Sequence, residues 1–410
     1  MKITILTIGS RGDVQPFLAL AIGLKNAGHT VNFGANPGFK DFIESRGIKF
    51  DLIKNNPMDI LKDEYKNTPY KERRKIYYEF MTNWILDGIE ASKNSDLIIF
   101  TPVYHVGYHV AEKLKIPFIK CSYVPYTPTK EFHNPFIKSV PYFLNKPSYL
   151  ISQFFEWQVI KNNINKLRKE LLGLNPIPVT GMLRKQHKEK MPVIYGFSKF
   201  VIPRPVDWPG WIYVTGYWFL KDLENYTPNK ELEDFINSGS QPLFFDIGSL
   251  GQYSEKIITK ILSVLLKTEY RIVANPGGAD ISKLNNSKKI YFVDGSVPHV
   301  WILPRVKAVM SHGGPGTVAA VLRAGKPLAV VPTYGDHKFW GNRVYNLGVG
   351  AQPLLTPIQN DELIIKTADE LMNNESLSKN AIALSEKIKK ENGVEKAVEI
   401  IEEVMRKRIS

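Results

Sequence analysis

Apolar positions in the first third of the chain alternate between short continuous runs and helical spacing. The runs have the length and the β-branched, aromatic content of buried strands, and they lie at 2–8, 29–35, 96–100 and 117–121. Segments with the periodicity of helices separate them, at 15–28, 38–47 and 107–115. Strands that alternate with helices in this way predict a parallel, doubly wound α/β sheet.

The same alternation returns in the second half of the chain. Strand-like runs occur at 242–249, 270–275, 290–295, 307–311 and 327–331. Helical patterns occupy 254–267, the segment that begins at Pro315, and 338–347. We therefore expect a second parallel sheet and a two-domain α/β protein.

The segment between the two halves has a weaker pattern and sets the expected domain boundary. Proline and aromatic residues are frequent from 122 onward, with one long amphipathic helix predicted at 148–172. Residues 221–240 are polar and rich in turn formers, so we expect a linker there. The predicted domains are 1–220 and 241–392. A final amphipathic helix in 393–410 is expected to pack back toward the first domain.

Composition narrows the class of protein. Of the 410 residues, 43% are hydrophobic, and Cys121 is the one cysteine, so no disulfide framework is possible. The short apolar run at the N-terminus resembles a strand rather than a signal peptide, and no run approaches the length of a membrane span. We expect a cytoplasmic protein.

The formal net charge of +14 favours anionic partners such as nucleotide sugars, anionic lipid or nucleic acid. Zinc-finger spacing and RNA-binding aromatic signatures are absent from the sequence, so no nucleic-acid partner is expected. Segment 70–86 interleaves basic residues with Tyr77, Tyr78, Phe80 and Trp84. A solvated helix face explains it most simply, and peripheral membrane contact is the alternative.

The segment SHGGPGT, residues 311–317, carries the clearest chemistry. It follows a predicted strand and opens a helix, where glycines allow a ligand to approach and free N–H groups favour an anion. His312 adds a possible donor to a phosphate oxygen. A tight turn is the alternative. Three further polar turns, at 246–250, 293–303 and 332–337, end strands of the same predicted sheet, which favours one shared site.

These motifs resemble those of the GT-B inverting glycosyltransferases of the sterol glucosyltransferase and antibiotic glycosyltransferase type. The resemblance covers nearly the whole chain. It rests on TIGSRGDVQPFLALAIGLKNAGH (7–29), YVPYTPTKEF (123–132), PRPVDWPGWIYVTGYW (203–218) and SHGGPGTVAAVLRAGKPLAVVPTYGDHKFWGNRVYNLGVG (311–350). It implies two Rossmann-like domains that face a cleft.

The resemblance also implies roles for individual residues. The donor diphosphate would be held by Ser249, His312, Gly314, Gly316 and Thr317. Val297 would present its backbone to the nucleobase, and Asp336 and His337 would bind sugar hydroxyls. A carboxylate and an imidazole suit that task, because both make directional hydrogen bonds to hydroxyls. A turn remains the alternative for the Gly335–His337 segment.

Asp13 lies in the turn after the first strand, before a helix with Pro16 near its start. Helix capping is the simplest explanation for an aspartate there. The resemblance implies that it is the general base that glycosyl transfer requires, and one residue can serve both roles. His29, His105, His109 and His133 are other candidate bases, each more typical of a structural or acceptor-lining histidine.

Two residues depart from the family pattern. Asp336-His337 stands where an Asp-Gln pair is common, which leaves the sugar open, and Ala320 stands where plant relatives carry a ribose-binding glutamate. The choice between UDP and dTDP is therefore open. The sequence has no Asp-x-Asp pair of the kind that bridges a diphosphate through a metal, so we expect no metal and no cofactor besides the nucleotide sugar.

The predicted function is transfer of a hexose from an α-linked UDP- or dTDP-sugar to a hydroxyl of a small apolar acceptor, with inversion to a β-glycoside. A sterol, polyketide, phenol or lipid-like alcohol is suggested by aromatic residues of the first domain, and a hydrophobic core that uses the same residues is the alternative. The residues are Tyr104, Tyr123, Tyr126, Phe132, Phe136, Tyr142 and Trp157. The alternatives are a GT-B-fold sugar-nucleotide epimerase and a non-catalytic nucleotide-sugar-binding protein. A dinucleotide-dependent oxidoreductase is disfavoured, because no G-x-G-x-x-G follows the first strand.

Overall fold

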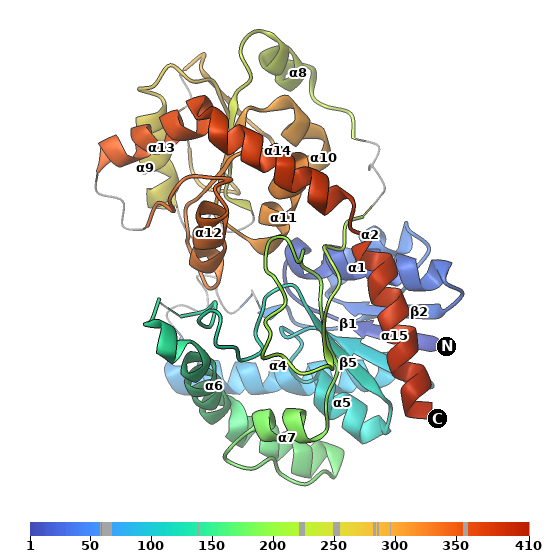
Figure 1. Ribbon diagram of the computed structural model, residues 1–410. Coiled ribbons are helices and arrows are strands. Elements are labelled where there is room, and N and C mark those ends of the chain that lie inside the picture. The colour runs from blue at the N-terminus through green and yellow to red at the C-terminus, as the bar shows by residue number, and fades with distance from the viewer. Residues whose placement is uncertain are drawn as a thin grey trace. The chain divides into compact units, whose positions relative to one another are not determined.

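A computed structural model describes the chain at 1–57, 59, 68–137, 139–220, 226–248, 255–281, 284, 287–295, 297–355 and 360–409 (Figure 1). The chain divides into two compact units. Unit 1 comprises 1–134, 138–220 and 392–410, and unit 2 comprises 135–137 and 221–391. Each unit is built on one parallel sheet, as the alternating pattern predicted.

Unit 1 contains a seven-stranded sheet in the order β3-β2-β1-β4-β5-β6-β7. Every neighbouring pair is parallel. The strands are β1 (Lys2–Leu6), β2 (Thr30–Ala35), β3 (Lys49–Leu52), β4 (Leu97–Phe100), β5 (Phe118–Ser122), β6 (Val193–Tyr195) and β7 (Ile212–Val214).

Helices cover both faces of this sheet. They are α1 (Arg11–Asn26), α2 (Lys40–Glu44), α4 (Tyr70–Ala91), α5 (Gly107–Leu114), α6 (Asn145–Leu167), α7 (Met182–Lys188) and α15 (Gly393–Ile409). Short 3-10 turns, η1 (Pro37–Phe39) and η3 (Tyr142–Leu144), precede α2 and α6, and a π-helical turn, η4 (Arg168–Leu172), continues α6. Alternate residues of β4 enter two separate cores, with Leu97 and Ile99 in one and Ile98 and Phe100 in the other. Burial on both faces explains why the strands are apolar throughout.

Unit 2 contains a five-stranded parallel sheet in the order β10-β9-β8-β11-β12. The strands are β8 (Leu243–Asp246), β9 (Ile272–Asn275), β10 (Ile290–Phe292), β11 (Ala308–Ser311) and β12 (Leu328–Val330). The helices are α8 (Lys230–Asn237), α9 (Glu255–Leu265), α10 (His299–Ile302), α11 (Pro315–Ala324), α12 (His337–Asn346), α13 (Asp361–Asn373) and α14 (Glu375–Lys389), with a 3-10 turn η7 (Leu303–Arg305) after α10.

Both sheets have a point where the strand order reverses. In unit 1 the chain moves outward from β1 to β3 and then crosses to β4, which pairs with the other side of β1. In unit 2 the same reversal falls between β8 and β11. Loops at the carboxyl ends of the two adjoining strands leave in opposite directions there, so ligands of open α/β sheets bind at such points.

The C-terminal helix α15 packs on α1 within unit 1. Ala397 and Ile401 are fully buried there, in the core cluster that contains Leu18 and Leu24 of α1. The helices approach so closely that a Cβ on Gly23 would lie 2.3 Å from the Val394 side chain. Residues 392–410 therefore complete the core of the N-terminal unit although they follow unit 2 in the sequence.

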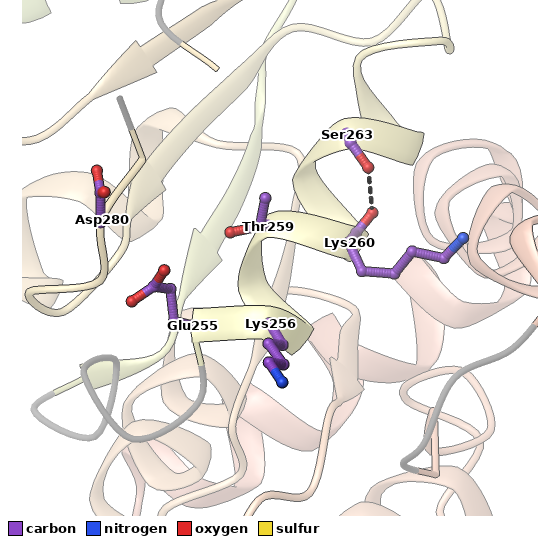
Figure 2. A pocket seen from close by; sticks show the side chains of 6 residues that line it. All are labelled: Glu255, Lys256, Thr259, Lys260, Ser263 and Asp280. Atoms are coloured by element: carbon purple, nitrogen blue, oxygen red, sulfur yellow. Dashed lines mark hydrogen bonds between the residues drawn. The ribbon is translucent and has the colours of Figure 1, made fainter. Parts of the chain in front are cut away.

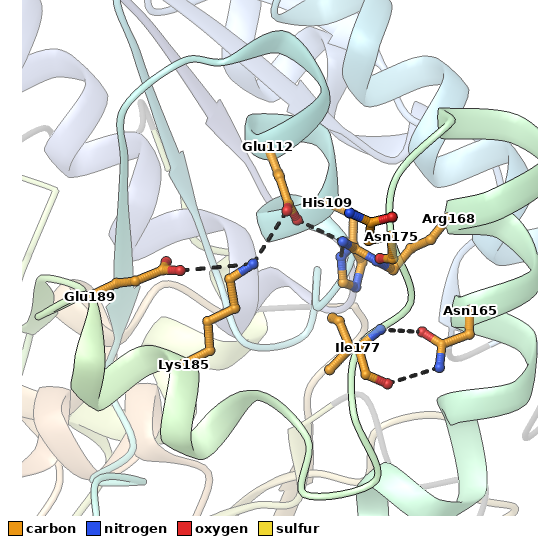
Figure 3. Close-up of polar contacts among 8 residues, drawn as sticks. All are labelled: His109, Glu112, Asn165, Arg168, Asn175, Ile177, Lys185 and Glu189. Atoms are coloured by element: carbon orange, nitrogen blue, oxygen red, sulfur yellow. Dashed lines mark hydrogen bonds and ion pairs between the residues drawn. The ribbon is translucent and has the colours of Figure 1, made fainter.

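A buried polar cluster joins η4 to α5 in unit 1 (Figure 3). Arg168, only 2% exposed, donates to Glu112 at 2.7 Å, to His109 Nδ1 at 3.0 Å and to the carbonyl of Asn175 at 2.7 Å. Lys185 reaches the other oxygen of Glu112 at 3.2 Å from the more exposed side. The hydrogen bonds satisfy a guanidinium that would be costly to bury alone.

Replacing Arg168 with Met should destabilise unit 1 by about 3–5 kcal/mol, because the buried His109 and the Asn175 carbonyl would lose their donor and the partly buried Glu112 would keep only Lys185. The matched variant Lys185→Met removes an outer ion pair and should cost less than about 1 kcal/mol. Urea denaturation followed by hydrogen exchange in α5 measures both. Equal losses in the two variants would contradict the central role given to Arg168.

Candidate functional site

Asp13 lies at the point in unit 1 where the strand order reverses. It occupies the third position of α1, directly after β1, and its backbone carbonyl accepts from the Thr7 hydroxyl at 3.0 Å. Thr7 in turn lies 3.2 Å from the hydroxyl of Thr101, which follows β4. The carboxyl ends of β1 and β4 thus hold the start of α1 in place.

Three hydrogen bonds orient the Asp13 carboxylate. Ser10 donates to Oδ2 from its backbone N–H at 2.7 Å and from its hydroxyl at 2.8 Å. The hydroxyl of Tyr123, just after β5, donates to Oδ1. Gly9 has a φ of +123°, and a Cβ there would lie 2.5 Å from Oδ2, so the turn needs glycine.

Burial raises the pKa of Asp13 above its ordinary value, although the hydrogen bonds from Tyr123 and Ser10 oppose the rise. A carboxylate with a raised pKa is a better proton acceptor than an exposed one. Oδ1 carries one hydrogen bond where Oδ2 carries two, so Oδ1 keeps the larger capacity to accept another.

The helix-capping explanation for Asp13 is also supported, with one correction. Ser10, not Asp13, is the residue that precedes α1, and Asp13 forms the second half of a capping box. Because α1 begins at Arg11, Pro16 lies in the second turn rather than the first. Tyr123 was expected only among acceptor-lining aromatic residues, and its hydrogen bond to Asp13 could not be read from a separation of 110 residues.

The other candidate bases of unit 1 are engaged elsewhere. His29 lies 3.0 Å from Glu402 of α15, and His105 lies 2.8 Å from the Tyr77 hydroxyl. His109 accepts from Arg168, and His133 Nδ1 lies 2.9 Å from the Asn134 carbonyl. Burial lowers the pKa of His105 to about 4 and, with the charge of Arg168, that of His109 to about 3. These contacts favour structural roles for the four histidines.

In unit 2, His312 lies where β8 and β11 diverge. Its backbone N–H donates to the carbonyl of Asp246 at 3.3 Å, and its Nδ1 lies 3.5 Å from the same oxygen. Two glycines leave room for the imidazole. A Cβ on Gly248 would lie 2.8 Å from Cε1, and a Cβ on Gly314 would lie 2.5 Å from Nε2. A side chain at either position would therefore displace the ring from this place.

Asp246 supports this histidine and was not anticipated as a site residue. Its carboxylate accepts from Gly248 N–H and from Asn275 Nδ2, both at 3.0 Å, and its Oδ2 lies 3.2 Å from His299 Nε2. Burial alone would raise the pKa of Asp246, but His299, His312 and the Gly248 N–H together hold it below its usual value. The sequence signal was present, because a charged residue ends an otherwise apolar strand.

The first turn of α11 supplies backbone donors beside His312. The N–H groups of Gly316 and Thr317 belong to the first turn, which has no intrahelical acceptor for them, and Pro315 begins the helix without an N–H. The helix dipole adds partial positive charge at this end. Burial lowers the pKa of His312, and the nearby Asp246 opposes the effect, so a bound phosphate would favour its protonated, donating form.

Asp336 and His337, the two residues predicted to bind sugar hydroxyls, lie at the start of α12. His337 is 5% exposed, and its ring centre is 4.9 Å from that of His312. Its Nδ1 accepts from the Tyr334 N–H at 3.3 Å, and burial with the charge of His312 lowers its pKa to about 3. The ring is therefore neutral with its proton on Nε2. Asp336 accepts from Trp340 Nε1 at 2.7 Å, which gives this carboxylate a structural role in addition to the predicted one.

Ser249 and Val297 are the remaining residues of the predicted donor site. Ser249 lies outside the described residues. Val297 is 8% exposed and lies two residues before His299, whose contact with Asp246 ties this segment to the end of β8.

No three His, Cys, Asp or Glu side chains of the described part of the chain are grouped so that they could hold a metal ion. Metal independence remains a prediction.

A hollow of about 320 Å³ lies beside α9 (Figure 2). Its walls are Glu255, Lys256, Thr259, Lys260, Ser263 and Asp280. It includes none of the predicted site residues, and its mostly charged and hydroxyl-bearing walls differ from the apolar lining of most small-molecule sites. We assign no role to it.

The structure corrects two expectations about apolar contacts in unit 1. Phe80 and Trp84 of α4, which suggested membrane contact for 70–86, are buried in the core. Tyr104 and Trp157, expected beside an acceptor, are buried in the same core. Tyr142 is 72% exposed, so it stays available to a ligand, and Phe136, which belongs to unit 2, is 47% exposed.

Comparisons with known proteins agree with this architecture. Residues 3–133 match the glycosyltransferase family 28 N-terminal domain, and residues 265–404 match the erythromycin biosynthesis protein CIII-like, C-terminal domain. The structure is similar to that of the glycosyltransferase of kitacinnamycin, with a TM-score of 0.75, 15% identity and 98% of each chain covered. The calicheamicin glycosyltransferase CalG4 superposes with a TM-score of 0.71 and 15% identity, over 100% of this chain and 99% of its own.

The chain has the GT-B fold, with a glycosyltransferase family 28 N-terminal domain and an erythromycin biosynthesis protein CIII-like C-terminal domain.

Among curated relatives of this GT-B protein, a sterol 3-beta-glucosyltransferase of Sclerotinia sclerotiorum is 34% identical over 98% of this chain and 29% of its own length. A sterol 3-beta-glucosyltransferase of Arabidopsis thaliana is 33% identical over 97% of this chain and 64% of its own. The GT-B chain therefore spans less than two thirds of these relatives. Of the helices that the structure describes, none is long and apolar enough to cross a membrane.

Gly314→Ala should weaken binding of UDP or dTDP at least about tenfold, because its Cβ would displace the His312 imidazole. Gly316→Ala is the matched control, since a Cβ there meets nothing within 4 Å and alanine favours the helix. Isothermal titration calorimetry without added metal measures both. Equal affinities in the two variants would show that the His312 ring position does not matter for the nucleotide.

Proposed function

We propose that this GT-B protein is an inverting glycosyltransferase that moves a hexose from a UDP- or dTDP-sugar to a hydroxyl of an apolar acceptor. The observation that carries the proposal is the His312 site. An imidazole held between two glycines lies beside the free N–H groups of a helix start, at the strand reversal of the C-terminal unit. This is an arrangement that suits a diphosphate.

The largest increase of negative charge in this reaction occurs on the leaving diphosphate. As the bond between the anomeric carbon and the phosphate oxygen breaks, its electron pair remains on the diphosphate. Protonated His312 and the N–H groups of Gly316 and Thr317 would stabilise that charge. Asp246, held anionic by His299 and other donors, would keep the His312 ring in place and favour its protonated form.

Asp13 would act on the acceptor. Its Oδ1 would take the proton of the acceptor hydroxyl while the acceptor oxygen forms a bond to the anomeric carbon. A single in-line displacement of this kind turns an α-linked donor into a β-glycoside. The raised pKa of Asp13, caused by burial, supports this role, and the capping box supports the fixed orientation that a general base needs.

We also propose which sugar and which acceptor this protein uses. His337 offers its Nε2–H as a hydrogen-bond donor, and Asp336 offers a carboxylate acceptor, so the pair can bind adjacent sugar hydroxyls. The relatives are named sterol 3-beta-glucosyltransferases, and one from Dictyostelium discoideum, 32% identical, is named a UDP-sugar-dependent glycosyltransferase. We propose UDP-glucose and a sterol as the first pair to test, with dTDP-sugars next.

The division of roles between the two units can be tested by two substitutions. Asp13→Asn should lower kcat by about 10²–10⁴-fold with little change in donor affinity, because only the proton transfer is lost. His312→Ala should weaken donor binding and lower kcat as well. Initial rates with UDP-glucose and a sterol, combined with calorimetry of UDP, measure both. Equal loss of donor affinity in the two variants would refute this division.

Tyr123→Phe should move the acidic limb of the kcat/KM profile to higher pH. The Tyr123 hydrogen bond lowers the pKa of Asp13, so its removal raises that pKa, and the base is then protonated at a higher pH. Rates at high pH should recover toward wild type. A uniform loss at every pH, with no shift of the limb, would show that Tyr123 acts only on the local structure.

A further inference from the structure

Two asparagine side chains hold the backbone of Gly9, which lies in the turn between β1 and α1. The Gly9 N–H donates to Asn36 Oδ1 at 2.9 Å, and the Gly9 carbonyl accepts from Asn56 Nδ2 at 3.2 Å. Asn36 is 3% exposed and directly follows β2, and Asn56 follows β3. The turn that leads to Asp13 is therefore held by residues that follow two neighbouring strands.

Further hydrogen bonds fix the orientation of the Asn36 amide. Its Nδ2 donates to the carbonyl of Ile53 at 3.3 Å and to that of Asn55 at 3.2 Å. Asn55 is anchored to α4, because its carbonyl accepts from Trp84 Nε1 at 2.8 Å and its Oδ1 accepts from Asn83 Nδ2 at 2.7 Å. The Asn36 amide cannot rotate without leaving buried polar groups unpaired.

The place of Gly9 constrains the Asp13 carboxylate. A Cβ on Gly9 would lie 2.5 Å from Asp13 Oδ2, so the carboxylate lies directly against the Gly9 backbone. The next residue, Ser10, donates to the same oxygen from its N–H and from its hydroxyl. A shift of Gly9 would therefore move both Ser10 donors away from Oδ2.

We propose that Asn36 and Asn56 are positioning residues for Asp13, which they hold in place through the backbone of Gly9. The inference rests on the proposed function, in which Asp13 is the general base. A base must stay within reach of the acceptor hydroxyl, and a misplacement of about 1 Å costs about a hundredfold in rate. The alternative is that the asparagines only stabilise the loops, which would lower the unfolding free energy without any change at Asp13.

A matched pair of substitutions on β2 separates the two explanations. Asn32 is 4% exposed and donates to the carbonyl of Ala91 at 3.5 Å instead of to Gly9. Asn36→Ala should lower kcat at least about tenfold and leave the affinity for UDP within about twofold, because only the base is displaced. Asn32→Ala should leave both within about twofold of the wild type. Initial rates with UDP-glucose and a sterol, with calorimetry of UDP, measure these values.

Titration of the Asp13 carboxyl by ¹³C NMR gives a readout that does not require transfer. The Asp13 signal is the one that Asp13→Asn removes. Burial raises the pKa of Asp13, and the hydrogen bonds from Tyr123 and Ser10 oppose the rise. Asn36→Ala should raise this pKa by at least about half a pH unit, because the Ser10 donors lose their fixed place. The acidic limb of kcat/KM should move to higher pH with it.

The more exposed partner provides a second variant in case Asn36→Ala does not fold, which thermal unfolding by circular dichroism shows. Asn56→Ala should change kcat and the Asp13 pKa in the same directions. An Asp13 pKa that does not rise in these variants, or that rises equally in Asn32→Ala, would overturn the proposal. If Asp13→Asn transfers glucose as fast as the wild type, the proposed function fails, and a rise of the Asp13 pKa in Asn36→Ala would still support the positioning.

Discussion

Burial of parallel strands on both faces is the constraint on which both units depend. β1, β4, β8 and β11 lie inside their sheets, between helical layers, so almost every side chain along them must be apolar. Polar side chains are therefore found at the strand ends. Ligands of open α/β sheets bind at the strand ends where the strand order reverses. Asp13 and His312 both lie at such a reversal. The position of the candidate chemistry therefore follows from the packing of the sheets.

The same residues that suit catalysis also stabilise the local structure. Asp13 closes a capping box, Asp336 accepts from the Trp340 indole, and Asp246 joins the end of β8 to the end of β9 and the start of α10. These contacts hold each polar group in one orientation before any substrate arrives, which lowers the cost of organising the site. Structural and catalytic explanations of these residues are therefore compatible.

Periodicity predicted both sheets and most helices, because strands buried on two faces and amphipathic helices leave strong local signals. The position of the His312 loop between a strand and a helix was predicted in the same way and is confirmed, and its role as an anion site stays a prediction. Contacts between distant segments could not. The Tyr123–Asp13 and His299–Asp246 pairs depend on separations of 110 and 53 residues. The burial of Phe80 and Trp84 in α4 was not predicted, and the sequence left Trp157 of α6 open between a ligand site and the core, since composition does not show which side of a helix packs.

The central claim is that a nucleotide sugar bound at His312 gives up its hexose with inversion. The most direct measurement is the anomeric configuration of the product, by proton NMR, after incubation with an α-linked UDP-glucose and a sterol without added metal. The account predicts a β-glycoside with release of UDP. An α-glycoside, or a sugar epimerised without use of the acceptor, would contradict it.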